Sequence, residues 1–181
     1  MKFCIRQIHE KFSEPQFSEL QRGVFSGIQL ESAAWAAACA AESAATQGTL
    51  QITSASHSPM VRFAAYVGKV LVGWSYGWFE RGNCFYMANS GVKPEYQRRG
   101  IYSALLKAAI SHAKQSGAHV VRSQHSVLNN PVIICKLQRG FHIVGLSTSA
   151  QMGVLVELQL HLSEPRYEFF KSRVIALAAP P

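Results

Sequence analysis

Apolar and polar positions alternate most clearly in the middle of the chain and again near its end. Between 61 and 92, three apolar and aromatic runs are interrupted at Gly68-Lys69 and at 80–83, a spacing typical of two hairpins in an antiparallel meander. Residues 153–162 repeat a period of two, with valine and leucine alternating against polar side chains. Further strands are predicted over 2–8, 118–128 and 141–145.

Helical periodicity and helix-end residues account for much of the remaining sequence. The segment from about 98 to 115 places apolar residues at intervals of three and four and stops at Gly117. The segment 130–141 predicts a short helix, with Asn129 or Asn130 as its cap, Pro131 in its first turn and Gly140 beyond its end. Other helices are predicted over 14–27, over the alanine-rich segment 29–48, and after Pro165, and a loop is predicted over 49–60.

Strands that adjoin helices, without an internal repeat or a linker, predict one α/β domain over residues 1–181. Hydrophobic residues make up 48% of the chain and charged residues 15%, as expected for a domain with a substantial core. No apolar run is long enough for a membrane span and the N-terminus lacks the apolar stretch of a signal peptide, so we expect a cytoplasmic location.

The charge balance favours an anionic partner. The chain has 18 lysines and arginines against ten acidic residues, a net charge of +8, and it contains no aspartate. Such a balance suits phosphate-bearing cofactors, nucleic acids or acidic surfaces. The four cysteines form no C-x-x-C pair and the histidines no H-E-x-x-H motif, so no metal site is expected.

The stretch Gly91–Leu106 carries the most specific chemistry. It runs from a strand end through the basic turn 97–100 into a helix. A helix N-terminus exposes unpaired N–H groups and a partial positive charge, which stabilise a bound anion. Gly100 allows close backbone approach, while Arg98 and Arg99 add positive charge. The alternative interpretation is a solvated turn before a surface helix.

The order of these motifs resembles the GNAT superfamily, the Gcn5-related N-acetyltransferases. The stretch "QRRGIY" at 97–102 matches the family's Q/R-x-x-G-x-G/A loop at Gln97 and Gly100, and "NNPVIICKLQRGF" at 129–141 resembles its later asparagine-to-Gly-Phe segment. The similarity covers about 61–146. It implies a GNAT-like mixed, mostly antiparallel twisted sheet of six or seven strands with helices on both faces.

The resemblance also implies acetyl-CoA as co-substrate and no metal. Amides of the turn and first helical residues would bind its pyrophosphate, backbone freed by a splayed strand would pair with pantetheine, and an asparagine would bond the cofactor arm. Ser90-Gly91 also suggests a bulge or a close backbone approach. The cofactor-binding residues implied are Ser90, Gly91, Val92, Gln97, Arg98, Arg99, Gly100, Ile101, Tyr102, Ser103 and Asn129, with Asn130 as the alternative to Asn129.

Two residues depart from the family pattern. Tyr102 stands where the family usually has glycine or alanine, so its ring must point away from the phosphate loop. Lys136 occupies the position of the tyrosine that often serves as general acid. A lysine can donate a proton to the departing thiolate, but we expect this one to be exposed and solvated, as lysines usually are.

The general base is left open at this stage. Amine attack on a thioester requires a neutral amine. Tyr86 lies about where the family often carries a carboxylate, and His125 titrates near neutrality when unperturbed. Glu157, on the polar face of a late strand, can face the acceptor, and Glu80 in a hairpin turn is expected to be solvated. A water relay without a dedicated base is a further alternative.

The expected activity is acetyl transfer from acetyl-CoA to a primary amine, on a small molecule or a peptide, by direct attack in a ternary complex. The helices over 14–48 would contribute to the acceptor site, and a homodimer is compatible with the family. The alternatives are a non-catalytic acyl-CoA-binding module and a basic nucleic-acid-binding domain with the strand aromatics as stacking platforms. The match to G-x-S-x-G at 73–77 lies inside a strand run, which argues against a hydrolase elbow.

Overall fold

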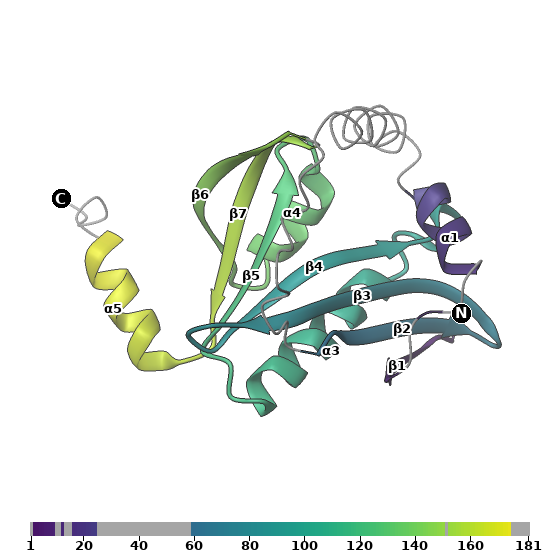
Figure 1. The fold of residues 1–181 in the computed structure, drawn as a ribbon, viewed down its shortest axis with the longest axis horizontal. Coiled ribbons are helices and arrows are strands. Elements are labelled where there is room, and N and C mark those ends of the chain that lie inside the picture. The colour runs from purple at the N-terminus through teal and green to yellow at the C-terminus, as the bar shows by residue number, and fades with distance from the viewer. Residues whose placement is uncertain (1, 10–11, 13–15, 25–58, 151, 175–181) are drawn as a thin grey trace, which may run out of the picture.

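The computed structural model describes residues 2–9, 12, 16–24, 59–150 and 152–174. Within these ranges, seven strands form one open mixed sheet in the order β1-β2-β3-β4-β5-β7-β6. Figure 1 shows the sheet twisting along its length, with helices on either side of it. The mixed, mostly antiparallel twisted sheet of six or seven strands with helices on both faces, expected from the sequence, is therefore confirmed.

The strands follow the predicted alternation closely. Their bounds are β1 Cys4–Ile8, β2 Val61–Val67, β3 Val70–Glu80, β4 Cys84–Val92, β5 Val120–Ser126, β6 His142–Ser149 and β7 Gly153–His161. The helices are α1 Gln16–Val24, the short 3₁₀ turn η1 Pro94–Tyr96, α3 Ile101–Gln115, α4 Asn130–Leu137 and α5 Glu164–Val174. None of the described helices has the length and apolar character needed to cross a bilayer.

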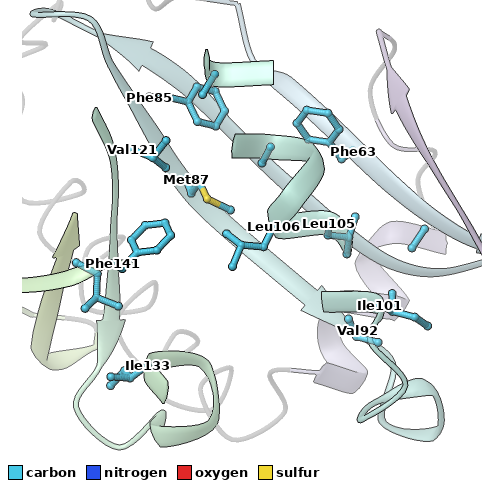
Figure 2. Close-up of a cluster of buried hydrophobic side chains, with 14 of the residues drawn as sticks. Phe63, Phe85, Met87, Val92, Ile101, Leu105, Leu106, Val121, Ile133 and Phe141 are labelled. Atoms are coloured by element: carbon cyan, nitrogen blue, oxygen red, sulfur yellow. The ribbon is translucent and has the colours of Figure 1, made fainter. Parts of the chain in front are cut away.

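One face of the sheet carries α3 and α4 over the main core. Apolar side chains of β4 and α3, such as Phe85 and Leu106, meet Val121 of β5, Ile133 of α4 and Phe141 in a continuous cluster (Figure 2). Burial of this apolar surface is the main stabilising contribution to the fold. The cluster holds α3 and α4 on the same side of the sheet.

The opposite face carries α1 and α5 at its two ends. Leu20 of α1 packs in a second cluster with the fully buried Trp74 of β3 and Ala64 of β2. At the other end, the ring of Phe170 of α5 lies tilted against that of His161 of β7, with ring centroids 4.7 Å apart. Between these two helices lies the face of β4, β5 and β7 that bears polar side chains.

The structure corrects the predicted start of one helix. The helix expected from about 98 begins at Ile101, because Arg98 has a φ of +58° and Gly100 a φ of +80°, which no α-helix accommodates. The short helix expected before Gly140 runs from Asn130 to Leu137, with Asn129 as its N-cap. The helix expected over 29–48 and most of the loop over 49–60 lie outside the described residues.

The expectation for the end of β4 is met through its second alternative. The register of β4 against β3 shifts before Asn89, two residues earlier than Ser90-Gly91. Gly91 instead makes a close approach, since a Cβ there would overlap the ring of Trp74. The backbone of β4 therefore lies directly against the indole.

Candidate active site

Strands β4 and β5 separate soon after they pair. They are the only parallel neighbours in the described sheet, and only three residue pairs join them, ending with Tyr86 opposite Arg122. Strand β4 continues to Val92 and β5 to Ser126, and Figure 1 shows the two diverging. Beyond Tyr86 the β5-facing edge of β4 has no described strand beside it, so its backbone groups are open to a ligand.

The basic turn lies just past the end of β4, where α3 begins. Gly100 is the N-cap of this 15-residue helix in a left-handed conformation, and a Cβ added to it would meet nothing within 4 Å. No described side chain caps the helix, so among the described residues its first N–H groups have no capping partner. The backbone thus provides a cradle with positive potential and open space in front of it.

Side chains of the turn have distinct contacts. The Nε2 of Gln97 donates to the carbonyl of Val92 at 3.1 Å, which ties the turn to the end of β4. The guanidinium of Arg99 lies 5.8 Å from the ring centre of Tyr96, while Arg98 is exposed. These contacts fix the path of the loop and leave its basic side chains on the surface.

Tyr102 turns inward, as the narrow loop requires. Its ring packs against the main core, and its buried hydroxyl has no hydrogen-bond partner among the described residues. Burial raises the pKa of this phenol well above its usual range. Ile101 is also buried, so of these two residues only the backbone amides can serve an anion.

A third cation reaches the start of α3 from the end of α4. The Nη2 of Arg139 donates to the Oγ of Ser103 at 2.6 Å, and its Nη1 donates to the carbonyl and Sγ of Cys135 at 2.7 and 3.1 Å. Arg139 thereby bridges α3 and α4, the two helices beside the split, which is the place beyond Tyr86 where β4 and β5 separate. The positive charge at the N-terminus of α3 is therefore larger than Arg98 and Arg99 alone indicate.

The other cofactor candidates occupy the two arms of the split. The Oγ of Ser90 donates to the Oγ of Ser75 on β3 at 2.8 Å, which leaves the main chain of Ser90 to Val92 as the part that can bind a ligand. Asn129 is the N-cap residue of α4, although its side chain makes no capping hydrogen bond, and Asn130 is the first helical residue and exposed.

The expectation that Lys136 is exposed was wrong. Its side chain is only 1% exposed, and its Nζ donates to the Oγ of Ser123 at 2.6 Å and lies 4.9 Å from the ring centre of Phe141. Burial lowers the pKa of Lys136 to about 7, because the charged form is desolvated. Helix α4 packs on β5 and carries this lysine inward, so its position in the helix overrides the usual preference for solvent.

Ser123 links Lys136 to His125. The Nε2 of His125 lies 3.2 Å from the Oγ of Ser123, and Ser123 is the first residue of β5 beyond the last pair with β4. Burial, together with the charge of Lys136, lowers the pKa of His125 to about 3. His125 is therefore neutral at physiological pH and a weak base.

The opposite face of the sheet carries a second polar network beside the split. Tyr86 donates its hydroxyl to the Oε1 of Gln124 at 3.1 Å, and the Nε2 of Gln124 donates to Glu157 at 2.8 Å and to Ser147 at 3.1 Å. The pKa of Tyr86 is raised, chiefly by burial. Tyr86 keeps its hydroxyl proton and donates it in a hydrogen bond to Gln124, so it is poorly suited to act as a base. Glu157, by contrast, presents an ionisable carboxylate.

Three residues of the site were not predicted from the sequence: Ser123, Gln124 and Arg139. Alternation along β5 places Ser123 on the same side as the buried Val121, and such a polar residue in an apolar alternation is a signal of a buried hydrogen bond. Arg139 directly precedes the Gly-Phe pair, but its contact with Ser103 depends on the tertiary fold.

Comparison with known proteins places this geometry in a family. The model of the acetyltransferase (GNAT) family matches residues 26–141, so the chain belongs to that family. It therefore carries an acetyltransferase domain. A search of curated protein sequences returned no significant match.

Solved structures share the fold at low sequence identity. The ribosomal-protein-S18-alanine N-acetyltransferase from Escherichia coli is 14% identical with a TM-score of 0.64, over 90% of this chain and 95% of that one. A Bacillus subtilis acetyltransferase in complex with CoA is 16% identical with a TM-score of 0.62, over 90% of this chain and all of that one.

A nourseothricin acetyltransferase is 20% identical with a TM-score of 0.53, over 57% of this chain and 66% of that chain. The match thus covers slightly less than two thirds of that enzyme. These likenesses establish the fold.

Proposed function

We propose that this protein transfers an acetyl group from acetyl-CoA to a primary amine by direct attack in a ternary complex. The observation that supports the proposal most strongly is the split between β4 and β5, which opens beside the basic N-terminus of α3. Acetyl-CoA supplies the acetyl group as a thioester, whose carbonyl carbon is open to a neutral amine. A phosphate-bearing ligand with an extended amide-containing arm matches both the cradle and the free strand edge.

The cofactor would be held largely by the main chain. The N–H groups from Arg98 to Ser103 would bind pyrophosphate, with Arg99 and Arg139 adding charge. The backbone of Ser90 to Val92 would pair with pantetheine amides as an added strand does, and Asn129, or Asn130, would contact the arm from α4. The inward ring of Tyr102 supports this assignment because it leaves the loop unobstructed.

Lys136 is the proposed general acid. Its Nζ lies at the head of the split, and a pKa of about 7 allows it to give up a proton near neutral pH. Ser123 orients the amine, and the neutral His125 can accept a hydrogen bond from the Ser123 hydroxyl. In this role Lys136 would protonate the departing thiolate.

Glu157 is the proposed base and binding group for the incoming amine. Among the candidates considered, it combines an ionisable carboxylate with a fixed position beside the split, since Gln124 holds it at 2.8 Å. Consecutive residues of a strand point to opposite faces, so Ser123 and Gln124 direct the acid and the base to opposite sides of the sheet. The acceptor would then enter from the face of Tyr86 and Glu157.

Calorimetric titration with acetyl-CoA tests the cofactor site. Wild type should bind with roughly micromolar affinity, while Arg99→Glu and Gly100→Trp should bind far more weakly. Gly117→Trp is the matched control, because Gly117 also has a positive φ, of +81°, and open space around it, but lies at the far end of α3. It should carry the same backbone strain and retain binding.

Each outcome separates the alternatives. Binding lost in both site variants but kept in Gly117→Trp supports the cofactor site, and turnover with a panel of amines then distinguishes an enzyme from a non-catalytic acyl-CoA-binding module. Absence of binding, with nucleic acid bound instead, would refute the proposal.

The cytoplasmic location and a homodimer stay predictions. The net charge of +8 favours an acidic or neutral acceptor over a polycation.

A further inference from the structure

The amine of Lys136 is unusual among the lysines that the structure describes. It is buried at the head of the split, where the last β4–β5 pair ends, and its hydrogen bond goes to a neutral hydroxyl, that of Ser123. Within the described part of the chain it forms no ion pair with a carboxylate. A buried ammonium without a counter-charge is strained electrostatically, and loss of its charge relieves that strain.

A lysine at this place has the same reactive group as the acceptor. The proposed reaction joins a primary amine to a thioester, and the Nζ of Lys136 is itself a primary amine, bonded to the first residue of β5 beyond its last pair with β4. A tyrosine hydroxyl there could at most form a labile ester, whereas a lysine forms a stable amide. The distinction between acid and acceptor therefore rests on whether Lys136 is charged or neutral.

We propose that Lys136 is a self-acetylation site, which takes the acetyl group of bound acetyl-CoA when no acceptor amine is present. The inference rests on the proposed function, because it requires acetyl-CoA in the split. The neutral Nζ attacks the thioester carbonyl carbon, a C–N bond forms and the C–S bond breaks. The proton lost from Nζ goes to the CoA thiolate, so the products are Nε-acetyl-Lys136 and free CoA.

The product fits the buried environment better than the ammonium does. Acetylation removes the charge and leaves one N–H, which can still donate to the Oγ of Ser123. The modified residue can no longer protonate a thiolate. Self-acetylation therefore switches the enzyme off when acetyl-CoA is abundant and the acceptor is scarce.

Peptide mass spectrometry on the full chain tests this. The protein is incubated with acetyl-CoA labelled in the acetyl group, without an amine, and label is followed at Lys136 and at the exposed Lys107 and Lys114 of α3. Label at Lys136 should appear more than about tenfold faster than at the two exposed lysines, because the thioester is held beside it. An amine-reactive acetylating ester that does not bind the site should give the reverse order.

Two controls make the result specific. Excess CoA without an acyl group should slow labelling of Lys136 and leave Lys107 unchanged, and Gly100→Trp should do the same. Retained labelling of Lys107 and Lys114 shows that the reagent is active. Lys136→Arg should show no label at that position, while its thermal stability reports that it is folded.

The two proposals fail in different ways. If calorimetry shows acetyl-CoA binding and amines are acetylated, but Lys136 stays unlabelled, self-acetylation is refuted and the proposed function stands. If acetyl-CoA does not bind, the proposed function is refuted, and self-acetylation is refuted with it. Label at Lys136 that CoA does not suppress would also overturn the inference, since it would mean reaction from bulk solvent.

Discussion

The Nζ of Lys136 lies 2.6 Å from the Oγ of Ser123, and this contact joins the last turn of α4 to the first residue of β5 beyond its last pair with β4. This hydrogen bond places a titratable group where the two parallel strands separate. The next residue along β5, Gln124, holds the carboxylate of Glu157 on the other side of the sheet. The alternation of one strand thus separates the proposed acid from the proposed base.

Ser123→Ala should change the pH dependence of turnover. The hydroxyl accepts a hydrogen bond from the charged form of Lys136, so its loss lowers the pKa of this lysine further. A general acid is active only while protonated, so the alkaline limb of the kcat profile should move to lower pH by about one to two units. Ser126→Ala on the same strand is the control. An unchanged limb would show that Lys136 is not the acid.

Lys136→Met should stabilise the protein near neutral pH. The pKa of Lys136 is about 7 in the folded chain, against 10.5 for an unperturbed lysine, so between these values the unfolded chain binds more protons. Wild-type stability should therefore rise from pH 7 to pH 10 and be lowest below pH 7, where the charged form is buried. The methionine variant lacks this slope and should gain about 2 kcal/mol or more at pH 7.

Urea unfolding at several pH values measures both effects of Lys136→Met. Lys107→Met serves as the control, because Lys107 is exposed. A wild-type stability that does not rise between pH 7 and pH 10 would contradict the burial of Lys136.

Glu157→Gln should lower kcat/KM for the amine by about 100-fold at neutral pH, since it removes the proposed base and the charge that attracts an ammonium. The substitution is nearly isosteric, and the fold should persist. Glu80→Gln is a matched control at the end of β3, where Glu80 lies 3.7 Å from Arg122. It should change kcat/KM by less than about twofold. Equal losses in the two variants would assign the effect to general electrostatics.

Gly91→Ala should destabilise the fold by about 2–4 kcal/mol, because the added methyl group overlaps the buried ring of Trp74. Gly145→Ala is the control, since a Cβ there lies 3.6 Å from its nearest neighbour, an ordinary contact. Chemical denaturation compares the two. An unchanged free energy of unfolding in Gly91→Ala would mean that the end of β4 moves away from the indole easily.

Much of the fold could be predicted from the sequence because strand alternation and helix-end residues are local signals. Hairpins at Gly68-Lys69 and 80–83, and the glycine that opens α3, follow from the conformations that these residues favour. The predicted helix start at about 98 was wrong, because Arg98 adopts a left-handed conformation that its residue type does not favour and the helix begins at Ile101.

The side-chain contacts at the split could not be predicted from the sequence in the same way. Burial of Lys136 depends on how closely α4 packs on β5, and the contact of Arg139 with Ser103 joins residues 36 positions apart. No local pattern encodes either distance. The pairing of Gln124 with Glu157 likewise depends on β7 being inserted between β5 and β6, a topological fact that periodicity along one strand does not contain.

The indole of Trp74 lies against the main chain of Gly91, and its Nε1 donates to the Oδ1 of Asn89 at 2.7 Å. Its fluorescence is therefore coupled to the stretch of β4 that is proposed to receive pantetheine. Occupation of that edge should change the emission of a chromophore shielded from solvent. The protein thus contains its own optical reporter, with which ligand association can be followed in real time without a label.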